Sequence, residues 1–388
     1  MRNQPSFFDD MRLTLEDAIE LSIASLTEYG QRYRHWVIAY SGGKDSSATV
    51  AFVAWAIKAG RVPAPQSLTV LYADTRMELP PLQRTAMRLL DDLAADGFDA
   101  RVVLPKMEDR FFVYMLGRGV PPPKNRFRWC TPQLKIEPMH AALADLRRTA
   151  GEKLLMLTGV RLGESAARDQ RIALSCSKDS GECGQGWFQV ATPESVADTL
   201  APLLHWRLCH VYDWLYFEND RHGYDVTGIA AIYGEEDVRT GCVGCNLASR
   251  DTALERLLRR DEWSHLAPLL ELKPLYTELT MPQYRLRKSE PERREDGAWS
   301  ANAQRLGPLT MDARRYALGR ILDIQQRAAV DLINPEEHAR IIELIEAGTW
   351  PNKWTGDEIT GDVLIDSIRV TPFGDIVTQS VLLGEEAQ

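Results

Sequence analysis

The chain has 388 residues, of which 44% are hydrophobic and 26% are charged, and its formal net charge is −9. Such a length and balance predict a soluble globular protein with one large α/β domain and an extension, or with two domains. The acidic charge argues against a protein that coats nucleic acid nonspecifically, although a local basic groove is compatible with it. The sequence contains no run of about 18 apolar residues and no apolar leader, so we expect no membrane span, no secretion and a cytoplasmic location.

The first predicted helix begins after Thr14 and ends at Gly30. Asp17 stands three residues after Thr14, which predicts a capping box with Asp in place of the usual Glu.

A glycine-rich loop follows the first predicted strand. Val37–Tyr40 is a short apolar run, the next six residues read SGGKDS, and a helix is expected over 47–58. Backbone N–H groups at such a turn, together with the helix dipole, hold an anion such as pyrophosphate. The spacing differs from that of the P-loop of kinases and GTPases. The predicted contacts are Ser41, Gly42, Gly43, Lys44, Ser46 and Ser47.

Further strands alternate with helices and predict a parallel sheet covered by helices. The second strand, Ser67–Ala73, ends at Asp74 and Thr75, and a helix over 80–96 and a strand over 101–104 follow. Ligands of open parallel sheets bind beyond the carboxyl ends of strands, which places Asp74 beside the loop. A helix N-cap is the alternative role for this aspartate.

The next strand is expected over 153–159, and arginines follow its carboxyl end. Arg161 and Arg168 would face the same crevice as the glycine-rich loop, where phosphate contact is the natural use of arginine. A solvated helix start is the alternative.

Six cysteines in a chain without an export signal favour thiol or metal chemistry over disulfides. Cys130 stands among cations, which favour its thiolate. Cys242 and Cys245 form a CxxC that suits two ligands of one metal centre, with a redox dithiol as the alternative. Zinc and a [4Fe–4S] cluster both accept four cysteines, so ligand count does not choose between them. Cys209 lies in an apolar helix and is expected to be buried and inert.

The C-terminal part is expected to be mostly helical. A helix is predicted over 250–269, a charged loop over 284–294, helices over 311–328 and 335–347, and a strand over 362–370.

Several of these motifs resemble one superfamily. The SGGKDS loop looks like the PP-loop of the adenine-nucleotide alpha-hydrolases, which split ATP between its α- and β-phosphates. Asp74 and Thr75 match the sulfate-reductase branch, as does the pattern Arg161, Glu164, Ser165 and Arg168. The segment 126–138, RFRWCTPQLKIEP, is similar to the sulfurtransferases of DNA phosphorothioate modification, and Lys135 is carried over as a phosphate- or substrate-facing lysine.

The resemblance implies a Rossmann-like fold, a parallel sheet flanked by helices, with an added mostly helical C-terminal part. It divides the chain into a PP-loop ATP pyrophosphatase domain (1–230), a CxxC and basic segment (231–300) and a helical extension (301–388). The implied catalytic residues are Lys44, Asp45, Lys135, Arg161 and Arg168. Nucleotide contacts extend to Asp74, Thr75 and Glu164, and either Asp45 or Asp74 would position Mg²⁺.

A [4Fe–4S] cluster is also implied by the resemblance, with Cys130, Cys242 and Cys245 as ligands. Cys183 is the expected fourth ligand and Cys176 the alternative. The implied activity is ATP-dependent sulfur transfer in which an acceptor, the DNA backbone, is adenylated. The implied partners are ATP, a cysteine desulfurase as sulfur donor, DNA and other modification subunits. Phosphoadenylyl-sulfate reduction, tRNA thiolation and a non-catalytic nucleotide-binding subunit are the alternatives.

Overall fold

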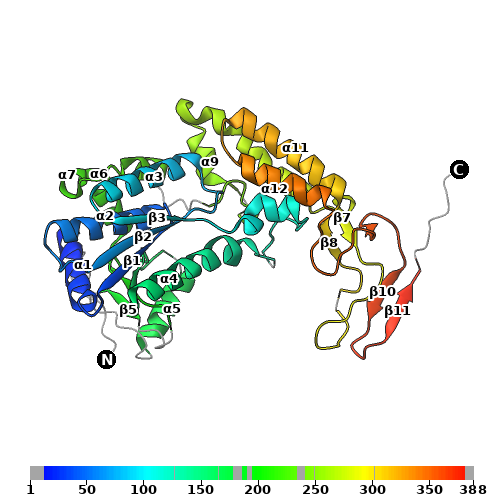
Figure 1. The fold of residues 1–388 in the computed structure, drawn as a ribbon, viewed down its shortest axis with the longest axis horizontal. Coiled ribbons are helices and arrows are strands. Elements are labelled where there is room, and N and C mark those ends of the chain that lie inside the picture. Colours follow the sequence, from blue (N-terminus) through cyan, green and yellow to red (C-terminus); the bar gives the residue numbers. More distant parts are fainter. Residues whose placement is uncertain are drawn as a thin grey trace, which may run out of the picture. The chain divides into compact units, whose positions relative to one another are not determined.

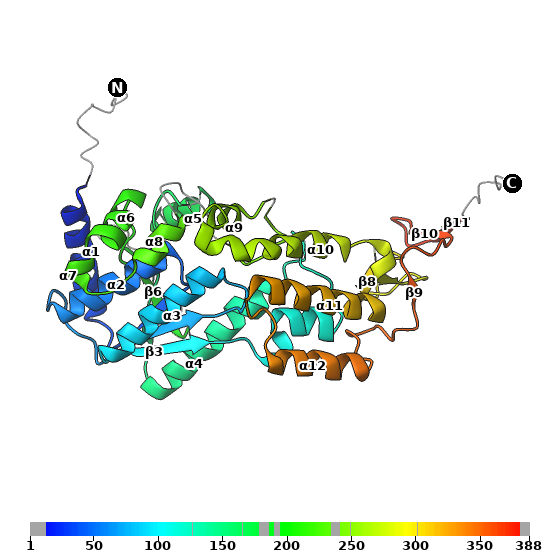
Figure 2. The same ribbon diagram turned by 90° about the horizontal axis from the view of Figure 1, so that it is seen from above.

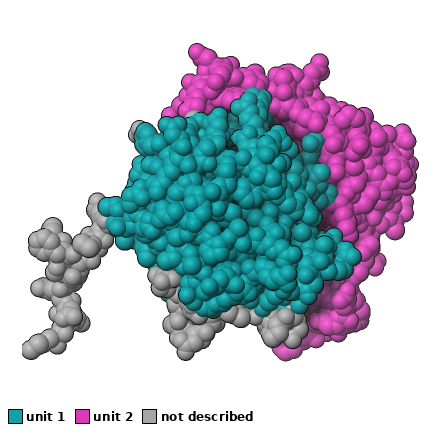
Figure 3. All heavy atoms as spheres, turned by 60° about the vertical axis from the view of Figure 1, so that its left-hand side comes forward, with its two compact units in different colours: residues 1–105, 135–241 teal, residues 106–134, 242–388 magenta. Residues whose placement is uncertain are grey.

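The computed structural model describes residues 13–125, 127–164, 166–177, 186–189, 195–233, 241–248, 250–300 and 302–380. The chain packs into two compact units, each built from two separate stretches (Figure 3). Unit 1 comprises residues 1–105 and 135–241, and unit 2 comprises residues 106–134 and 242–388. The three domains expected from the sequence stay a prediction, because compact packing does not show which stretch folds on its own.

A six-stranded sheet forms the centre of unit 1, in the order β3-β2-β1-β4-β6-β5. Its mostly parallel strands confirm the predicted α/β class. Since β1 lies between β2 and β4, the loops that follow these three strands meet at one edge of the sheet. The parallel strands are β1 (His35–Tyr40), β2 (Ser67–Ala73), β3 (Asp99–Val103), β4 (Leu154–Leu157) and β6 (Ala197–Ala201), and β5 (Trp187–Gln189) is antiparallel to β6.

Helices cover both faces of this sheet (Figure 1). On one face lie α2 (Lys44–Lys58) and α3 (Pro80–Ala95), and on the other lies α4 (Glu137–Ala150). Leu143 of α4 is buried in one cluster with Val37, Leu71 and Leu154 of the strands. Burial of each such side chain contributes about 1.5–3 kcal/mol, so this cluster fixes α4 on the sheet.

The N-terminal helix α1 (Leu15–Gly30) begins with the predicted capping box. The Asp17 N–H donates to Thr14 Oγ1 at 3.2 Å, and the Thr14 N–H donates to Asp17 Oδ2 at 3.0 Å. The other described helices of unit 1 are α5 (Ala166–Ser177), α6 (Leu208–Phe217), α7 (Asn219–His222) and α8 (Thr227–Tyr233).

Unit 2 combines helices with two small sheets. In it α11 packs on η4 and α10, and α12 packs on η2 (Figure 2). The order of one sheet is β8-β7-β9, and β10 and β11 form a hairpin. Its helices are η1 (Met107–Asp109), η2 (Val113–Gly117), α9 (Thr252–Leu257), η4 (Asp261–Glu271), α10 (Leu272–Glu278), η5 (Pro282–Tyr284), α11 (Met311–Ala328) and α12 (Pro335–Glu346). Its strands are β7 (Arg285–Arg287), β8 (Leu306–Leu309), β9 (Ile359–Thr360), β10 (Ser367–Val370) and β11 (Ile376–Gln379), while η3 (Pro132–Ile136) spans the sequence junction of the units.

The stretch 106–134 is tied to the C-terminal helices by charged side chains. Arg110 pairs with the buried Glu337 at 3.0 Å, and Arg340 pairs with Glu108 at 2.6 Å. The fully buried Arg314 of α11 donates from Nη1 to the Gly117 carbonyl at 3.2 Å. These contacts explain why this early stretch belongs to unit 2.

Three expectations for secondary structure and burial are wrong. The helix predicted over 250–269 is broken into α9 and the 3₁₀ segment η4, which contains Pro268, a residue that cannot donate a helical hydrogen bond. The loop predicted over 284–294 contains strand β7, paired with both β8 and β9. Cys209 is exposed, because α6 buries residues such as Val211 and Trp214 on its other side.

None of the described helices has the length and apolar character that a membrane crossing requires.

Candidate functional site

The loop between β1 and α2 has the geometry of an anion-binding turn. Gly42 has a φ of +73°, in the left-handed region that favours glycine. A Cβ atom there would lie 3.3 Å from the Tyr72 ring and 3.4 Å from the Ala86 Cβ, so the position has little room for a side chain. Gly43 is the N-cap of α2, and the helix begins at Lys44. The positive end of the helix dipole therefore meets the loop.

Serine hydroxyls hold this loop in shape. Ser46 Oγ donates to the Gly43 carbonyl at 3.0 Å and lies 3.0 Å from Ser41 Oγ. Ser47 Oγ also donates to the Gly43 carbonyl, at 2.9 Å, and is fully buried beneath the loop. Ser41 and Ser46 line the adjoining cavity, whereas Ser47 supports the loop from below.

A cavity of about 330 Å³ opens beside the loop, within unit 1. Lys44 is nearly buried, with its Nζ 4.9 Å from the centre of the Tyr233 ring and 3.4 Å from Asp45 Oδ2. A cavity that presents a lysine, backbone N–H groups and hydroxyls is suited to a phosphate chain. The lining residues are Ala39, Ser41, Gly43, Lys44, Asp45, Ser46, Lys135, Gly159, Glu164 and Tyr233.

Arg161 reaches this cavity through Asp45. Its guanidinium donates from Nε to Asp45 Oδ1 and from Nη1 to the Trp206 carbonyl at 3.2 Å, and the side chain is buried. Asp45 therefore stands between two cations, Arg161 and Lys44. This arrangement fixes the carboxylate at the cavity wall.

Gly159 brings the end of β4 against the loop. A Cβ atom at this position would lie 2.9 Å from the carbonyl carbon of Asp45 and 2.9 Å from the Ser46 nitrogen. Backbone atoms cannot rotate away as a side chain does, so any larger residue must displace the loop or the strand.

We expect Gly159→Ala to lower the free energy of unfolding by about 1–3 kcal/mol and to weaken the ATP binding that the sequence predicts at this loop, because the added methyl group displaces the loop. Urea denaturation and calorimetric titration with ATP measure the two effects. The matched control is Gly319→Ala in α11, where no atom lies within 4 Å of the new Cβ and stability should be kept or raised. Wild-type ATP affinity in Gly159→Ala would contradict this account of the loop.

Asp74 and Thr75 lie beyond β2 and do not line the cavity among the described residues. Asp74 accepts hydrogen bonds from the Arg76 N–H at 2.8 Å and from Gln83 Nε2 at 3.0 Å, and Thr75 Oγ1 donates to Glu78 Oε1 at 2.7 Å. Burial raises the pKa of Glu78, and the charge of Asp74 raises it further. The N-cap of α3 is Leu79, so Asp74 does not take that alternative role.

The remaining predicted residues fall into two groups. Lys135 and Glu164 line the cavity, as expected for residues that face a ligand. Arg168 belongs to α5, but its side chain lies outside the described part, as does that of Cys176. Ser165 and Cys183 lie wholly outside the described residues.

The CxxC forms a tight turn within unit 2. The Cys245 N–H donates to the Cys242 carbonyl at 3.1 Å, and Gly244 has a φ of +65°. A Cβ on Gly244 would lie 2.7 Å from Leu272 Cβ and 3.3 Å from the Tyr276 ring. Burial, and then the negative charge of Cys242 and Cys245, raise the pKa of Tyr276 well above its usual value.

Cys130 is connected to this turn through aromatic rings. Phe111 packs on Tyr276, with centroids 5.7 Å apart, and stacks on Trp129 at 5.2 Å, next to Cys130 in the chain. Cys130, Cys242 and Cys245 are all half-buried cysteines. Among the residues described, no three His, Cys, Asp or Glu side chains gather as a group that could hold a metal ion.

Three residues that line the cavity were not among the site residues predicted from the sequence: Ala39, Gly159 and Tyr233. Tyr233 ends α8 and contacts both Lys44 and Gly43, yet it lies far from the loop in the chain and in no recognisable motif. Gly159 had a usable signal, since it ends the strand expected over 153–159, and a glycine in a strand often marks a close backbone approach.

Three solved structures are similar to this chain at low identity. The phosphoadenylyl-sulfate reductase from Candida auris, in a phosphate complex, is 14% identical, with 53% of this chain and 87% of that chain covered and a TM-score of 0.32. The FMN adenylyltransferase of Candida glabrata, with FMN and an ATP analogue, is 13% identical, with 56% and 62% covered and a TM-score of 0.33. The U34-tRNA thiolase NcsA from Methanococcus maripaludis, with its [4Fe–4S] cluster, is 12% identical, with 68% and 79% covered and a TM-score of 0.35.

A search of the curated proteins finds no match. The model of the phosphoadenosine phosphosulfate reductase domain matches residues 35–246, more than half of the chain, from β1 through the CxxC. Together with the mostly parallel sheet and the loop at the end of β1, this match shows that the chain belongs to the phosphoadenosine phosphosulfate reductase domain family.

Proposed function

We propose that this protein is an ATP-dependent sulfurtransferase that cleaves ATP to AMP and pyrophosphate and adenylates an acceptor, the DNA backbone. The observation that carries the ATP step is the glycine-rich loop at the start of α2, with Lys44 and the Asp45–Arg161 pair at one cavity wall. Family membership supports the use of an adenine nucleotide or a related compound.

The chain's own residues divide the work between binding and charge stabilisation. Backbone N–H groups of Gly42 and Gly43, the Lys44 ammonium and the Ser46 hydroxyl hold the pyrophosphate. An acceptor oxygen attacks the α-phosphorus, the bond to the bridging α–β oxygen breaks, and the negative charge that develops there is stabilised by Lys44 and the helix dipole. Arg161 positions Asp45, and Lys135, Glu164 and Arg168 are proposed to face the nucleotide or acceptor.

Mg²⁺ prefers carboxylate and phosphate oxygens, and Asp45 presents a carboxylate at the cavity wall, whereas Asp74 is not among the described residues that line the cavity. Asp45 is therefore the residue that we propose to position the ion. When bound, the ion would neutralise charge on the phosphate chain.

The thiols of unit 2 are chemically suited to a [4Fe–4S] cluster. Cys130, Cys242 and Cys245 are the proposed ligands, with Cys183 or Cys176 as the fourth. Tyr276 supports this assignment, because its buried hydroxyl has no hydrogen-bond partner among the described residues and lies beside the CxxC. A hydroxyl so placed can donate to a sulfur atom. A bound cluster would supply a sulfur or electron relay, or hold this region together.

After adenylation, AMP is the leaving group for sulfur. A persulfide, of the kind that a cysteine desulfurase supplies, attacks the acceptor phosphorus as AMP departs, and a thiol reductant then cleaves the sulfur–sulfur bond to leave the phosphorothioate. Phosphoadenylyl-sulfate reduction and tRNA thiolation are the rival reactions. A non-catalytic nucleotide-binding subunit is the rival without chemistry.

Radiolabelled ATP separates these proposals. The protein is incubated with Mg²⁺, a cysteine desulfurase with cysteine, and either duplex DNA or tRNA, and AMP and incorporated sulfur are measured. We expect AMP formation with sulfur in DNA. Incorporation of sulfur into tRNA would show that tRNA, and not DNA, is the acceptor. Formation of sulfite from phosphoadenylyl sulfate would favour the reductase reaction. The absence of AMP under all conditions would refute the ATP step.

A further inference from the structure

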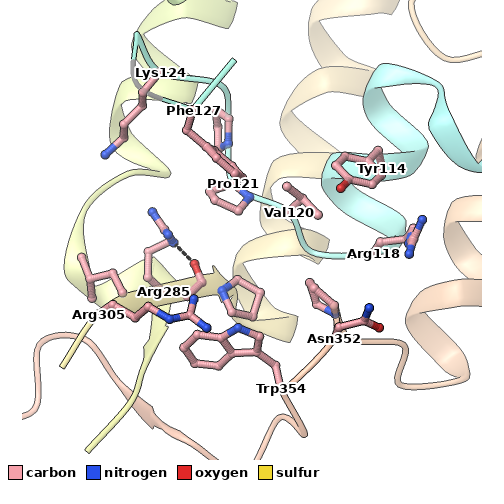
Figure 4. A pocket seen from close by; sticks show the side chains of 15 residues that line it. Tyr114, Arg118, Val120, Pro121, Lys124, Phe127, Arg285, Arg305, Asn352 and Trp354 are labelled. Carbon is pink, nitrogen blue, oxygen red and sulfur yellow. Dashed lines mark hydrogen bonds between the residues drawn. The ribbon is translucent and has the colours of Figure 1, made fainter. Parts of the chain in front are cut away.

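A second cavity, of about 540 Å³, lies within unit 2 (Figure 4). None of the described residues that line it belongs to the cavity beside the glycine-rich loop, which we call the nucleotide cavity. It is enclosed by the turn after η2, by β7 and β8, and by the segment 351–354. Its size falls in the range of small-molecule and nucleotide sites. The side chains that matter most are Tyr114, Arg118, Lys124, Phe127, Arg285 and Trp354.

The lining is cationic, and none of the described residues in it is acidic. Four of these residues are basic, and within the described part of the chain only Arg305 has a carboxylate partner, Glu292, at 2.5 Å. Arg118, Lys124 and Arg285 have no ion pair among the described residues. Three uncompensated cations in a chain of net charge −9 mark a local site for an anion.

Arg285 is the most constrained of these cations. It is 6% exposed, and its Nε donates to the Gly307 carbonyl at 2.5 Å, which aims the guanidinium from β7 into the cavity (Figure 4). Burial lowers the pKa of Arg285 to about 10. Burial, and then the charge of Arg285, lower the pKa of Lys124. A bound anion would relieve the repulsion between these two groups.

Apolar and aromatic side chains form the rest of the wall. Trp354 is 8% exposed and packs on Gly307, where a Cβ atom would overlap the indole, so this ring serves as the floor. The Phe127 ring is 47% exposed at the rim. Two backbone hydrogen bonds, Lys124 N–H to the Phe127 carbonyl at 3.2 Å and the reverse at 2.8 Å, hold Lys124 and Phe127 on one turn. On this turn the Lys124 cation is suited to contact a phosphate of a nucleotide, and the exposed Phe127 ring is suited to stack on its base.

Strand β7, which carries Arg285, extends the cationic surface beyond this cavity. Arg287, two residues after Arg285, lines a separate hollow of about 570 Å³ together with Arg369. Its buried Nε has no hydrogen-bond partner among the described residues. Two cationic hollows along one strand fit a chain of regularly spaced phosphates better than a single free nucleotide.

We propose that the unit 2 cavity binds one nucleotide of a single nucleic-acid strand, with its phosphate between Arg285 and Lys124 and its base against Phe127. This inference deepens the proposed function and rests on the acceptor being a nucleic-acid backbone.

Fluorescence anisotropy with a short labelled single-stranded oligonucleotide tests the site in the full-length protein. Lys124 and Phe127 are exposed, so Lys124→Gln and Phe127→Ala should fold. We expect each variant to weaken binding by about tenfold, and Lys124→Gln to reduce the slope of log affinity against log salt by about one. The matched control is Arg259→Gln, which removes one exposed cation next to α9 and should bind like the wild type.

Wild-type affinity in both Lys124→Gln and Phe127→Ala would overturn the proposal, as would an equal loss in Arg259→Gln. A DNA and an RNA oligonucleotide of the same sequence are compared to identify the kind of strand that binds. The ligand is the oligonucleotide that binds more tightly and whose affinity the two substitutions lower. If the variants lose affinity for free AMP but not for either oligonucleotide, a mononucleotide site replaces the proposed one.

Measurement of AMP formation from ATP tests the proposed function independently of oligonucleotide binding. Without nucleic acid, Lys124→Gln and Phe127→Ala should form AMP at the wild-type rate, because neither residue belongs to the nucleotide cavity. Oligonucleotide binding with the expected losses in a protein that forms no AMP would support the cavity assignment and refute the ATP step alone.

Discussion

Lys44→Ala is expected to slow the formation of AMP and pyrophosphate by about 100- to 1,000-fold while the protein stays folded. Lys44 is the point charge at the start of α2, and its loss leaves the developing charge on pyrophosphate without its nearest cation. Alanine is a strong helix former, so α2 should persist. Release of AMP from labelled ATP measures the rate, and circular dichroism checks the fold.

The control lies at the other end of the same helix. Lys58 pairs with Asp96 at 2.6 Å and is remote from the cavity, so Lys58→Ala should keep the wild-type rate and change stability by less than about 1 kcal/mol. Lys44→Arg keeps the charge but changes its shape and should recover only part of the rate. Undiminished AMP release in Lys44→Ala would show that the loop is not the site of ATP cleavage.

Cys242→Ser is expected to remove the brown iron–sulfur absorbance of anaerobically purified protein, together with its iron and sulfide. A serine hydroxyl replaces one of the thiolates that we propose to hold the cluster, and cluster binding depends on each of them. Absorption spectra and analysis for iron, sulfide and zinc measure the loss. Cys245→Ser and Cys130→Ser should behave alike.

Cys209 supplies the matched control, because it is an exposed free thiol in α6 of unit 1. Cys209→Ser should keep the full iron and sulfide content. If the wild-type protein contains zinc and no iron, the cysteines hold a zinc ion and not an iron–sulfur cluster. Iron and sulfide that survive Cys242→Ser would remove this residue from the ligand set.

Local chemistry made much of unit 1 predictable. Thr14 and Asp17 cap α1 as their spacing requires, and β2 has the bounds that its apolar run indicates. The loop over 41–46 supplies half of the described residues that line the cavity, because adjacent residues of one tight turn must lie together in space. Such features depend on interactions within a few residues of the chain.

Features that depend on distant parts of the chain were not predictable in this way. Tyr233 enters the cavity beside the glycine-rich loop from α8, and no short-range pattern specifies that approach. The exposure of Cys209 depends on which side of α6 faces the core, and an apolar segment with few polar residues does not reveal it. The residue pair Arg110 and Glu337 is equally invisible in sequence, since the partners meet only after folding.

The discontinuity of unit 2 has a consequence for synthesis on the ribosome. Residues 106–134 emerge about a hundred residues before Cys242, the first residue of the stretch on which they pack. Their apolar side chains, including Phe111, Phe112 and Trp129, must therefore remain uncovered while the rest of unit 1 is translated. Aggregation during this interval, or binding by a chaperone, would limit the yield of folded protein more than the equilibrium stability of either unit.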